Sequence, residues 1–171
     1  MQTLDSPPTQ SADIGLLRDL RWLVEEFNYE YAAVLDRCEI SKWPSFFTQD
    51  GVYRLVARDN ADANLPLSLM SCEGMGMLQD RAYAIENTEM FAPRYVHHQV
   101  TQIRVTGVDA GIVSAEAAYT VLETLIDEPT RILQCGRYFD KFVRHGDGLL
   151  LKERRCIYDT LLVPTCVVYP V

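Results

Sequence analysis

The stretch Trp43–Tyr53 places the strongest restriction on how this chain can fold. It begins with closely spaced aromatic side chains around Pro44, a residue that helices accept only in their first turn. It ends with an Asp-Gly pair, which favours a turn, followed by residues typical of a strand. We therefore expect a short helix near Ile40–Phe47, a turn over Gln49–Gly51 and a strand over Val52–Ala57.

A long amphipathic helix is predicted before this stretch. Its apolar residues recur at steps of three and four, the spacing of one helix face, at Leu16, Leu20, Leu23, Phe27, Tyr31 and Leu35. Asp13 is the expected N-cap, because its carboxylate can accept hydrogen bonds from the first free backbone N–H groups. We expect the polar residues 1–13 to form a flexible or partner-bound arm and residues 14–171 to form one domain.

The residues between this strand and Pro93 carry three further predictions. Arg58–Asn64 is polar and lacks an apolar period, which indicates a surface loop. Leu65–Met70 is apolar and is predicted to be extended. Gly74–Glu89 has the spacing of a helix whose inward face carries Met77, Leu78, Ala82 and Ile85.

The C-terminal half of the chain is predicted to form a β-sheet. Four long segments are separated by short turns, and they span Arg94–Val105, Ile112–Ile126, Arg131–Val143 and Leu149–Leu162. Simple alternation in the first segment places one set of side chains on a shared face, namely Tyr95, His97, Gln99, Thr101, Ile103 and Val105. Helices followed by a strand meander predict an α+β fold, in which a cone-shaped, curved antiparallel sheet wraps around the N-terminal helices.

Charge and hydropathy exclude two classes of partner. The chain carries 24 Asp and Glu against 16 Lys and Arg, whereas nucleic-acid binding requires a basic surface. No apolar run approaches the about 20 residues that cross a membrane. The first residues lack the basic start and the apolar run of a secretory signal. We expect a cytoplasmic protein that binds neither nucleic acid nor membranes.

The cysteines are interpreted as reduced thiols. They are widely spaced, odd in number and without a Cys-x-x-Cys pair, at Cys38, Cys72, Cys135, Cys156 and Cys166. In a chain without a secretory signal, this pattern favours free thiols that serve mostly as small core residues.

The three histidines do not have the spacing of a metal site. His97 and His98 are neighbours in a predicted strand, so their side chains point to opposite faces. His145 lies in a predicted hairpin loop. A mononuclear iron site requires two histidines and a carboxylate on one face, and a Rieske cluster requires paired Cys and His ligands. We expect no catalytic, cofactor-binding or metal-binding residue in this chain.

An acid–base pocket inside the cone is the alternative. Four side chains could converge there: Tyr31, Asp36, Tyr53 and His97. Asp36 would orient the His97 imidazole as a general base, an arrangement that resembles scytalone dehydratase and related isomerases. In the simpler interpretation His97 or His98 is an interior histidine whose ring nitrogens are hydrogen-bonded within the protein. The pairing register of the strand decides which of the two faces inward. A pocket that binds a small ligand without chemistry is the third interpretation.

Charged residues on the last two predicted strands suggest ion pairs. Lys152–Arg155 is expected to alternate its charges outward, toward solvent or a partner. Arg137–Asp140 lies on the adjacent strand, so cross-strand pairs with Arg154 and Arg155 are expected, each weak if exposed.

The end of the chain is apolar and uncharged from Leu161 to Val171. An exposed segment of this kind would promote aggregation. It is therefore expected to be buried against the core or against another subunit, and we favour a subunit interface.

Seven short motifs follow one another in a recognisable order: Tyr31, Leu35-Asp36, Trp43–Phe47, Asp50–Tyr53, Met77–Arg81, Arg94–His98 and Gly136–Asp140. Together they resemble the small, or β, subunit of Rieske-type aromatic-ring-hydroxylating dioxygenases. The resemblance covers about residues 15–163. Gly136–Asp140 and the loop Asn60–Pro66 resemble most closely the subunits that act with aromatic carboxylates such as terephthalate or salicylate.

This resemblance implies a cone fold similar to nuclear transport factor 2 and scytalone dehydratase. It also implies that a large, or α, subunit holds the Rieske iron–sulfur cluster and the mononuclear non-haem iron. The small subunit would scaffold an assembly of three large and three small subunits, with contacts between small subunits. We expect a chain that is inactive by itself and belongs to an oxygenase acting on an aromatic, carboxylated compound.

Overall fold

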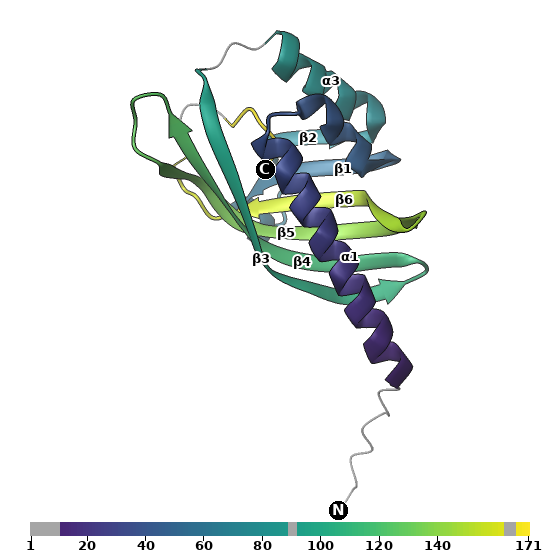
Figure 1. Cartoon of the computed structure of the whole chain (residues 1–171). Coiled ribbons are helices and arrows are strands. Elements are labelled where there is room, and N and C mark those ends of the chain that lie inside the picture. Colours follow the sequence, from purple (N-terminus) through teal and green to yellow (C-terminus); the bar gives the residue numbers. More distant parts are fainter. Residues whose placement is uncertain (1–10, 89–91, 163–166) are drawn as a thin grey trace, which may run out of the picture.

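A curved sheet wrapped around one long helix forms the framework of the protein (Figure 1). The computed structural model describes residues 11–88, 92–162 and 167–171. The helical elements are α1 (Ser11–Asp36), the 3₁₀ helix η1 (Ile40–Phe46), α2 (Arg58–Asp62) and α3 (Gly74–Asn87). The strands are β1 (Phe47–Ala57), β2 (Met70–Glu73), β3 (Arg94–Asp109), β4 (Ile112–Leu125), β5 (Arg131–His145) and β6 (Gly148–Tyr158).

The strands lie in the order β2-β1-β6-β5-β4-β3 in one six-stranded sheet. The predicted antiparallel meander is confirmed for β3 to β6, where each strand pairs with its sequence neighbour. β1 instead runs parallel to β6, so the sheet is not antiparallel throughout. The long strands curl around α1, and α3 packs against β1 and η1 (Figure 1). The predicted α+β cone is therefore confirmed.

The apolar face of α1 packs on the inner side of the sheet. Leu20 and Leu35 are buried there, whereas Leu16 is 48% exposed. The first turns of α1 extend beyond the edge of the sheet (Figure 1), so the predicted stripe has no surface to cover at Leu16. The predicted apolar stripe is therefore buried only along the part of α1 that has a strand of the sheet opposite it.

The N-terminal boundary also differs from the prediction. α1 begins at Ser11, so Asp13 lies within the helix and is not its N-cap. The helix thus takes three residues of the expected arm, and residues 1–10 lie outside the described part of the chain.

An aromatic cluster joins η1 to β1. The Trp43 ring meets Phe47 edge to face at 5.5 Å and Tyr53 at 5.2 Å between ring centroids. β1 begins at Phe47, so the turn predicted at Gln49–Gly51 was wrong, and an irregularity in the pairing with β6 lies there instead. Gly51 suits this position because a Cβ would lie only 2.8 Å from the Cβ of Phe47.

Two of the three predictions between β1 and β3 need correction. The polar segment after β1 contains the short helix α2 rather than only a loop. Strand pairing begins at Met70, and the preceding leucines are exposed, at Leu65, Leu67 and Leu69. On α3 the inward face is confirmed at Leu78 and Ile85, but Met77 is 48% exposed because consecutive helix residues point in different directions.

A β-bulge divides β3 into two parts. Pairing with β4 shifts between Thr101 and Arg104, where Gln102 has a φ of 54°. The extra residue exchanges the two faces of the strand beyond this point. The single face predicted from alternation was therefore wrong: Tyr95, His97, Gln99 and Thr101 face outward, whereas Ile103 and Val105 pack against the core.

A second bulge turns a charged side chain into the core. The pairing of β5 with β6 leaves Lys152 without a ladder partner, so Arg154 faces inward and is 0% exposed, contrary to the predicted outward alternation. Its Nε donates to Asp140 Oδ1 at 2.9 Å, and its Nη2 donates to Asp140 Oδ2 at 2.7 Å. Nη2 also donates to Asn28 Oδ1 at 2.7 Å. The predicted cross-strand pair is confirmed, but it is buried.

Aromatic rings complete the surroundings of Arg154. Its Cζ lies 4.3 Å from the ring centroid of Tyr31 and 4.1 Å from that of Tyr138. Burial disfavours the charged form, yet the pKa of Arg154 lies well above its usual value because the Asp140 carboxylate stabilises the guanidinium. The buried ion pair therefore links α1, β5 and β6.

Removal of one partner of this pair should destabilise the fold. We expect Arg154→Met to lower the free energy of unfolding by about 3 kcal/mol or more, because it leaves the Asp140 carboxylate buried and unpaired. The double variant Arg154→Met/Asp140→Leu should regain part of this loss. Urea denaturation followed by circular dichroism measures both, with Arg155→Met on the outer face as the control. An Arg154→Met protein as stable as the control would contradict the assigned role.

Candidate functional site

Residues 167–171, the last described part of the chain, fill the interior of the cone. The main-chain oxygen of Val171 accepts hydrogen bonds from the hydroxyls of Tyr31 and Tyr53, each at 3.4 Å. The Val171 N–H donates to the Tyr53 hydroxyl at 3.0 Å, and Val171 is only 1% exposed. Both tyrosines of the predicted pocket therefore bind the chain's own backbone.

The rest of this segment fills the space beside them. Val168 is buried, and its carbonyl accepts a hydrogen bond from Arg81 Nη2 at 2.6 Å. The cavity lined by residues 167–171 and by β3, β4 and β5 has a volume of about 10 Å³, which is the space of a single water molecule. The favoured subunit interface was therefore wrong for residues 167–171, which belong to this chain's own core. Residues 163–166 lie outside the described part of the chain.

The inward-facing histidine is His98, not the His97 of the predicted acid–base site. The His98 side chain is 2% exposed and that of His97 is 64% exposed. Asp36, at the end of α1, holds both: its carboxylate lies 2.6 Å from His98 Nδ1 and 3.2 Å from His97 Nδ1. It also accepts the His98 backbone N–H at 2.9 Å. His98 turns inward because its neighbours Val96 and Val100 lie on the core face of β3.

The four predicted site residues are not assembled around an open space. Asp36 and His98 have the contact of an orienting carboxylate and a base, but the hydroxyls of Tyr31 and Tyr53 are engaged by Val171. His98 Nε2 has no hydrogen-bond partner among the described residues and borders the small cavity. No substrate larger than a water molecule fits against it.

Burial also keeps the interior groups protonated. It raises the pKa of the Cys156 thiol to about 12 and the pKa of Tyr31 and Tyr53 well above their usual values. None of these groups exchanges a proton near neutral pH. Their role is structural, because each lies in hydrogen-bond or sulfur contact with Val171.

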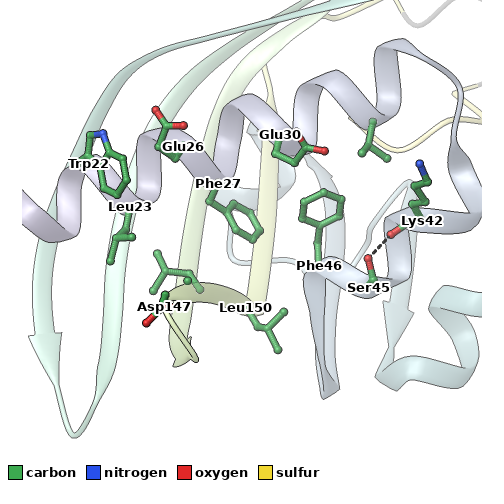
Figure 2. A pocket seen from close by; sticks show the side chains of 13 residues that line it. Trp22, Leu23, Glu26, Phe27, Glu30, Lys42, Ser45, Phe46, Asp147 and Leu150 are labelled. Carbon is green, nitrogen blue, oxygen red and sulfur yellow. Dashed lines mark hydrogen bonds between the residues drawn. The ribbon is translucent and has the colours of Figure 1, made fainter.

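A larger hollow lies beside α1 (Figure 2). It has a volume of about 540 Å³ and is bounded by α1, η1 and the turn between β5 and β6. Its apolar wall consists of Trp22, Leu23, Phe27, Val34, Phe46, Leu149 and Leu150, and its charged groups are Glu26, Glu30, Lys42 and Asp147. The sequence did not predict this hollow, because residues from three distant segments form it. The exposed Trp22 on the outer face of α1 was the one available signal.

The described residues supply no set of ligands for a metal ion. No three His, Cys, Asp or Glu side chains gather among them in a metal-binding arrangement. Within the same residues, no helix combines the length and the apolar character needed to span a membrane.

The two histidines should differ in their effect on stability. His98→Ala should lower the free energy of unfolding by about 2 kcal/mol, because it removes a buried side chain and leaves the Asp36 carboxylate short of a partner. His97→Ala should change it by about 0.5 kcal/mol or less, because the side chain is exposed. Urea denaturation of both variants measures the difference. Equal losses would contradict the inward orientation of His98.

Stability should decline in alkaline solution. The folded protein holds the Cys156 proton up to a pKa of about 12, whereas an unfolded chain releases it near 9.0. The unfolded state therefore binds fewer protons than the folded state above this lower value, and stability falls as pH rises. Thermal melts between about pH 8 and about pH 10.5 measure the decline. Cys156→Ala should decline less steeply, and an identical slope for this variant would refute the contribution of the thiol.

Comparison with known proteins is consistent with this architecture. A family profile described as ring hydroxylating beta subunit matches residues 30–165. The small subunit of anthranilate 1,2-dioxygenase from Burkholderia cepacia is 31% identical over 82% of this chain and 88% of that protein. Subunit beta 2 of the terminal oxygenase component of terephthalate 1,2-dioxygenase from Comamonas is 28% identical over 86% and 96%.

Solved structures support the same assignment. A beta subunit proposed to belong to an aromatic-ring-hydroxylating dioxygenase of Novosphingobium aromaticivorans superposes with a TM-score of 0.84 and 36% identity, covering 91% of this chain and 99% of that one. A proposed scytalone dehydratase of the same organism has a TM-score of 0.66 at 17% identity over 94% and 93%, a likeness of fold alone. The chain belongs to the family of beta subunits of aromatic-ring-hydroxylating dioxygenases.

Proposed function

We propose that this chain is the non-catalytic small subunit of an oxygenase that hydroxylates an aromatic carboxylate. Two relatives support the substrate class, because the compounds in the names of their enzymes, anthranilate and terephthalate, are both aromatic carboxylates. In this proposal the chain provides shape and contacts that hold larger subunits in register, and all chemistry takes place in those subunits.

The observation that carries the proposal is an apolar rim at one end of the sheet. Eight large apolar side chains, each between 48% and 93% exposed, lie where β1, β4 and β6 end and where β2, β3 and β5 begin: Leu65, Leu67, Leu69, Tyr95, Ile126, Ile132, Leu161 and Leu162. Apolar patches of this kind mark surfaces that bind other proteins. We refer to these eight residues as the apolar rim.

Three arginines near the apolar rim have carboxylate partners. Arg94 and Arg131 each lie 2.7 Å from the buried carboxylate of Glu123. Arg58 lies 2.7 Å from Asp159. The surface that the rim presents to a binding partner is therefore mainly apolar, as in permanent subunit interfaces.

The proposal divides the work between unlike subunits. The described residues of this chain bring together no ligands for an iron–sulfur cluster or a mononuclear iron, so we assign both centres to the large subunit. The family resemblance suggests three large and three small subunits with contacts between small subunits. We also propose a cytoplasmic location, which the odd number and wide spacing of the cysteines favour.

The closed interior weighs against the two other interpretations. A dehydratase or isomerase that uses His97, Asp36 and Tyr53 needs an open pocket, but Val171 occupies it and His97 faces solvent. A ligand-binding module with the same pocket meets the same obstacle, because the remaining cavity holds about 10 Å³.

Co-expression with the neighbouring large-subunit reading frame tests the proposal. We expect the chain to elute from size-exclusion chromatography with a larger iron–sulfur protein, and the isolated chain to show no turnover of an aromatic carboxylate. Leu67→Glu/Leu161→Glu should abolish co-elution, because two charges would be buried in an apolar interface. Met77→Glu/Tyr83→Glu, two exposed apolar residues on α3, is the matched control. Failure to bind any large subunit, or turnover by the isolated chain, would refute the proposal.

A further inference from the structure

The hollow beside α1 has the shape of a docking groove, which we call the α1 groove. Its floor is aromatic: Phe27 meets Phe46 edge to face at 5.4 Å and the core residue Phe142 at 5.0 Å between ring centroids. Trp22 stands at one side and is 59% exposed, and Leu150 closes the opposite side (Figure 2). A large aromatic side chain left in solvent beside an apolar hollow favours contact with another protein.

The edge of the α1 groove is acidic. Three carboxylates, Glu26, Glu30 and Asp147, accompany one ammonium group, Lys42. Lys42 is already paired with Glu39 at 3.0 Å, so it does not neutralise the groove. Within the described residues no ion pair forms at Glu26 or Asp147, whereas Glu30 lies 3.5 Å from Arg37. An occupant should therefore bring positive charge to the edge of an apolar floor.

The polar chemistry favours a protein segment over a small molecule. Specific small-molecule pockets combine an apolar lining with a few buried polar groups that orient the ligand. Here the Ser45 hydroxyl donates its hydrogen bond to the Lys42 carbonyl at 2.7 Å, so it is not available to donate to a ligand. The remaining polar groups lie at the exposed edge (Figure 2). A protein segment with apolar side chains and a flanking Lys or Arg matches both the apolar floor and the acidic edge of the groove.

The position of the α1 groove gives it a role separate from that of the apolar rim. The turn between β5 and β6 bounds the groove, and it lies at the end of the sheet opposite to the ends of β4 and β6, which carry the rim. One small subunit with binding surfaces at both ends can bridge two neighbours, which a scaffold requires.

We propose that the α1 groove binds an apolar segment of the large oxygenase subunit that carries Lys or Arg beside its apolar side chains. This inference rests on the proposed function and specifies one of its contacts. The segment places apolar side chains on Phe27, Phe46 and Leu150, covers Trp22, and directs its cation toward Glu26.

Trp22 makes occupancy of the α1 groove measurable. The chain has two tryptophans, and Trp43 is 0% exposed, so it serves as an internal reference. The small subunit is labelled with 5-hydroxytryptophan, which can be excited apart from the tryptophans of the large subunit, and acrylamide quenching is measured with and without unlabelled large subunit. We expect quenching of Trp22 in the free chain and its loss in the complex. Trp22→Phe should remove the quenched signal.

Charge reversal tests the cation. Glu26→Lys should weaken binding of the large subunit about tenfold or more and reduce its dependence on salt, because it places like charges together. Asp80→Lys, the same charge change on the exposed side of α3, should leave binding unchanged.

The outcomes separate this inference from the proposed function. Absence of any complex refutes the proposed function itself. A complex in which Trp22 stays quenchable, or in which Glu26→Lys binds as Asp80→Lys does, overturns the groove assignment alone. Protection of Trp22 by self-association of the small subunit, without the large one, also overturns it, because the occupant is then a second copy of this chain.

Discussion

The contact between Arg154 and Asp140 is the interaction on which the shape of the cone depends. One guanidinium reaches β5 through Asp140 and α1 through Asn28, and it lies between the rings of Tyr31 and Tyr138. Burying a charge is costly unless it is paired and hydrogen-bonded. The ion pair fixes β6 against β5, and the Asn28 hydrogen bond holds α1 to both, so displacement of α1 would remove a hydrogen-bond acceptor from a buried guanidinium.

Closure of the interior follows from the same arrangement. Tyr31 stacks on Arg154 with its ring and uses its hydroxyl for both Trp43 and the main chain of Val171. Tyr53 holds the same residue through its hydroxyl. A cone whose interior is occupied by its own chain leaves no room there for a substrate. This physical constraint agrees with membership of a family of subunits rather than of free-standing enzymes.

The two proposed binding surfaces on the outside of the protein differ in their polarity and charge. The arginines near the apolar rim are paired with carboxylates of this chain, so binding there would depend mainly on apolar burial. The α1 groove combines an apolar floor with unpaired carboxylates, so its binding would also depend on charge and on salt. The two surfaces lie at opposite ends of the sheet, and this separation suits a subunit that connects neighbours.

Local patterns in the sequence determined much of the architecture. The periodicity of α1, the inward side of α3 at Leu78 and Ile85 and the four-stranded meander were all predicted, because they depend on the spacing of neighbouring residues. The order of short motifs also indicated the family. The cross-strand partner of Arg154 was expected from strand adjacency alone.

Tertiary structure decided which side of each strand faces the core. The bulges at Gln102 and Lys152 exchange faces, so they turned Ile103 and Arg154 inward against simple alternation. The inward position of His98, the burial of Val171 and the α1 groove likewise depend on residues far apart in the chain. Alternation describes one strand at a time, whereas a bulge or a packed terminus is set by the partner across the sheet, and local sequence does not contain that partner's register.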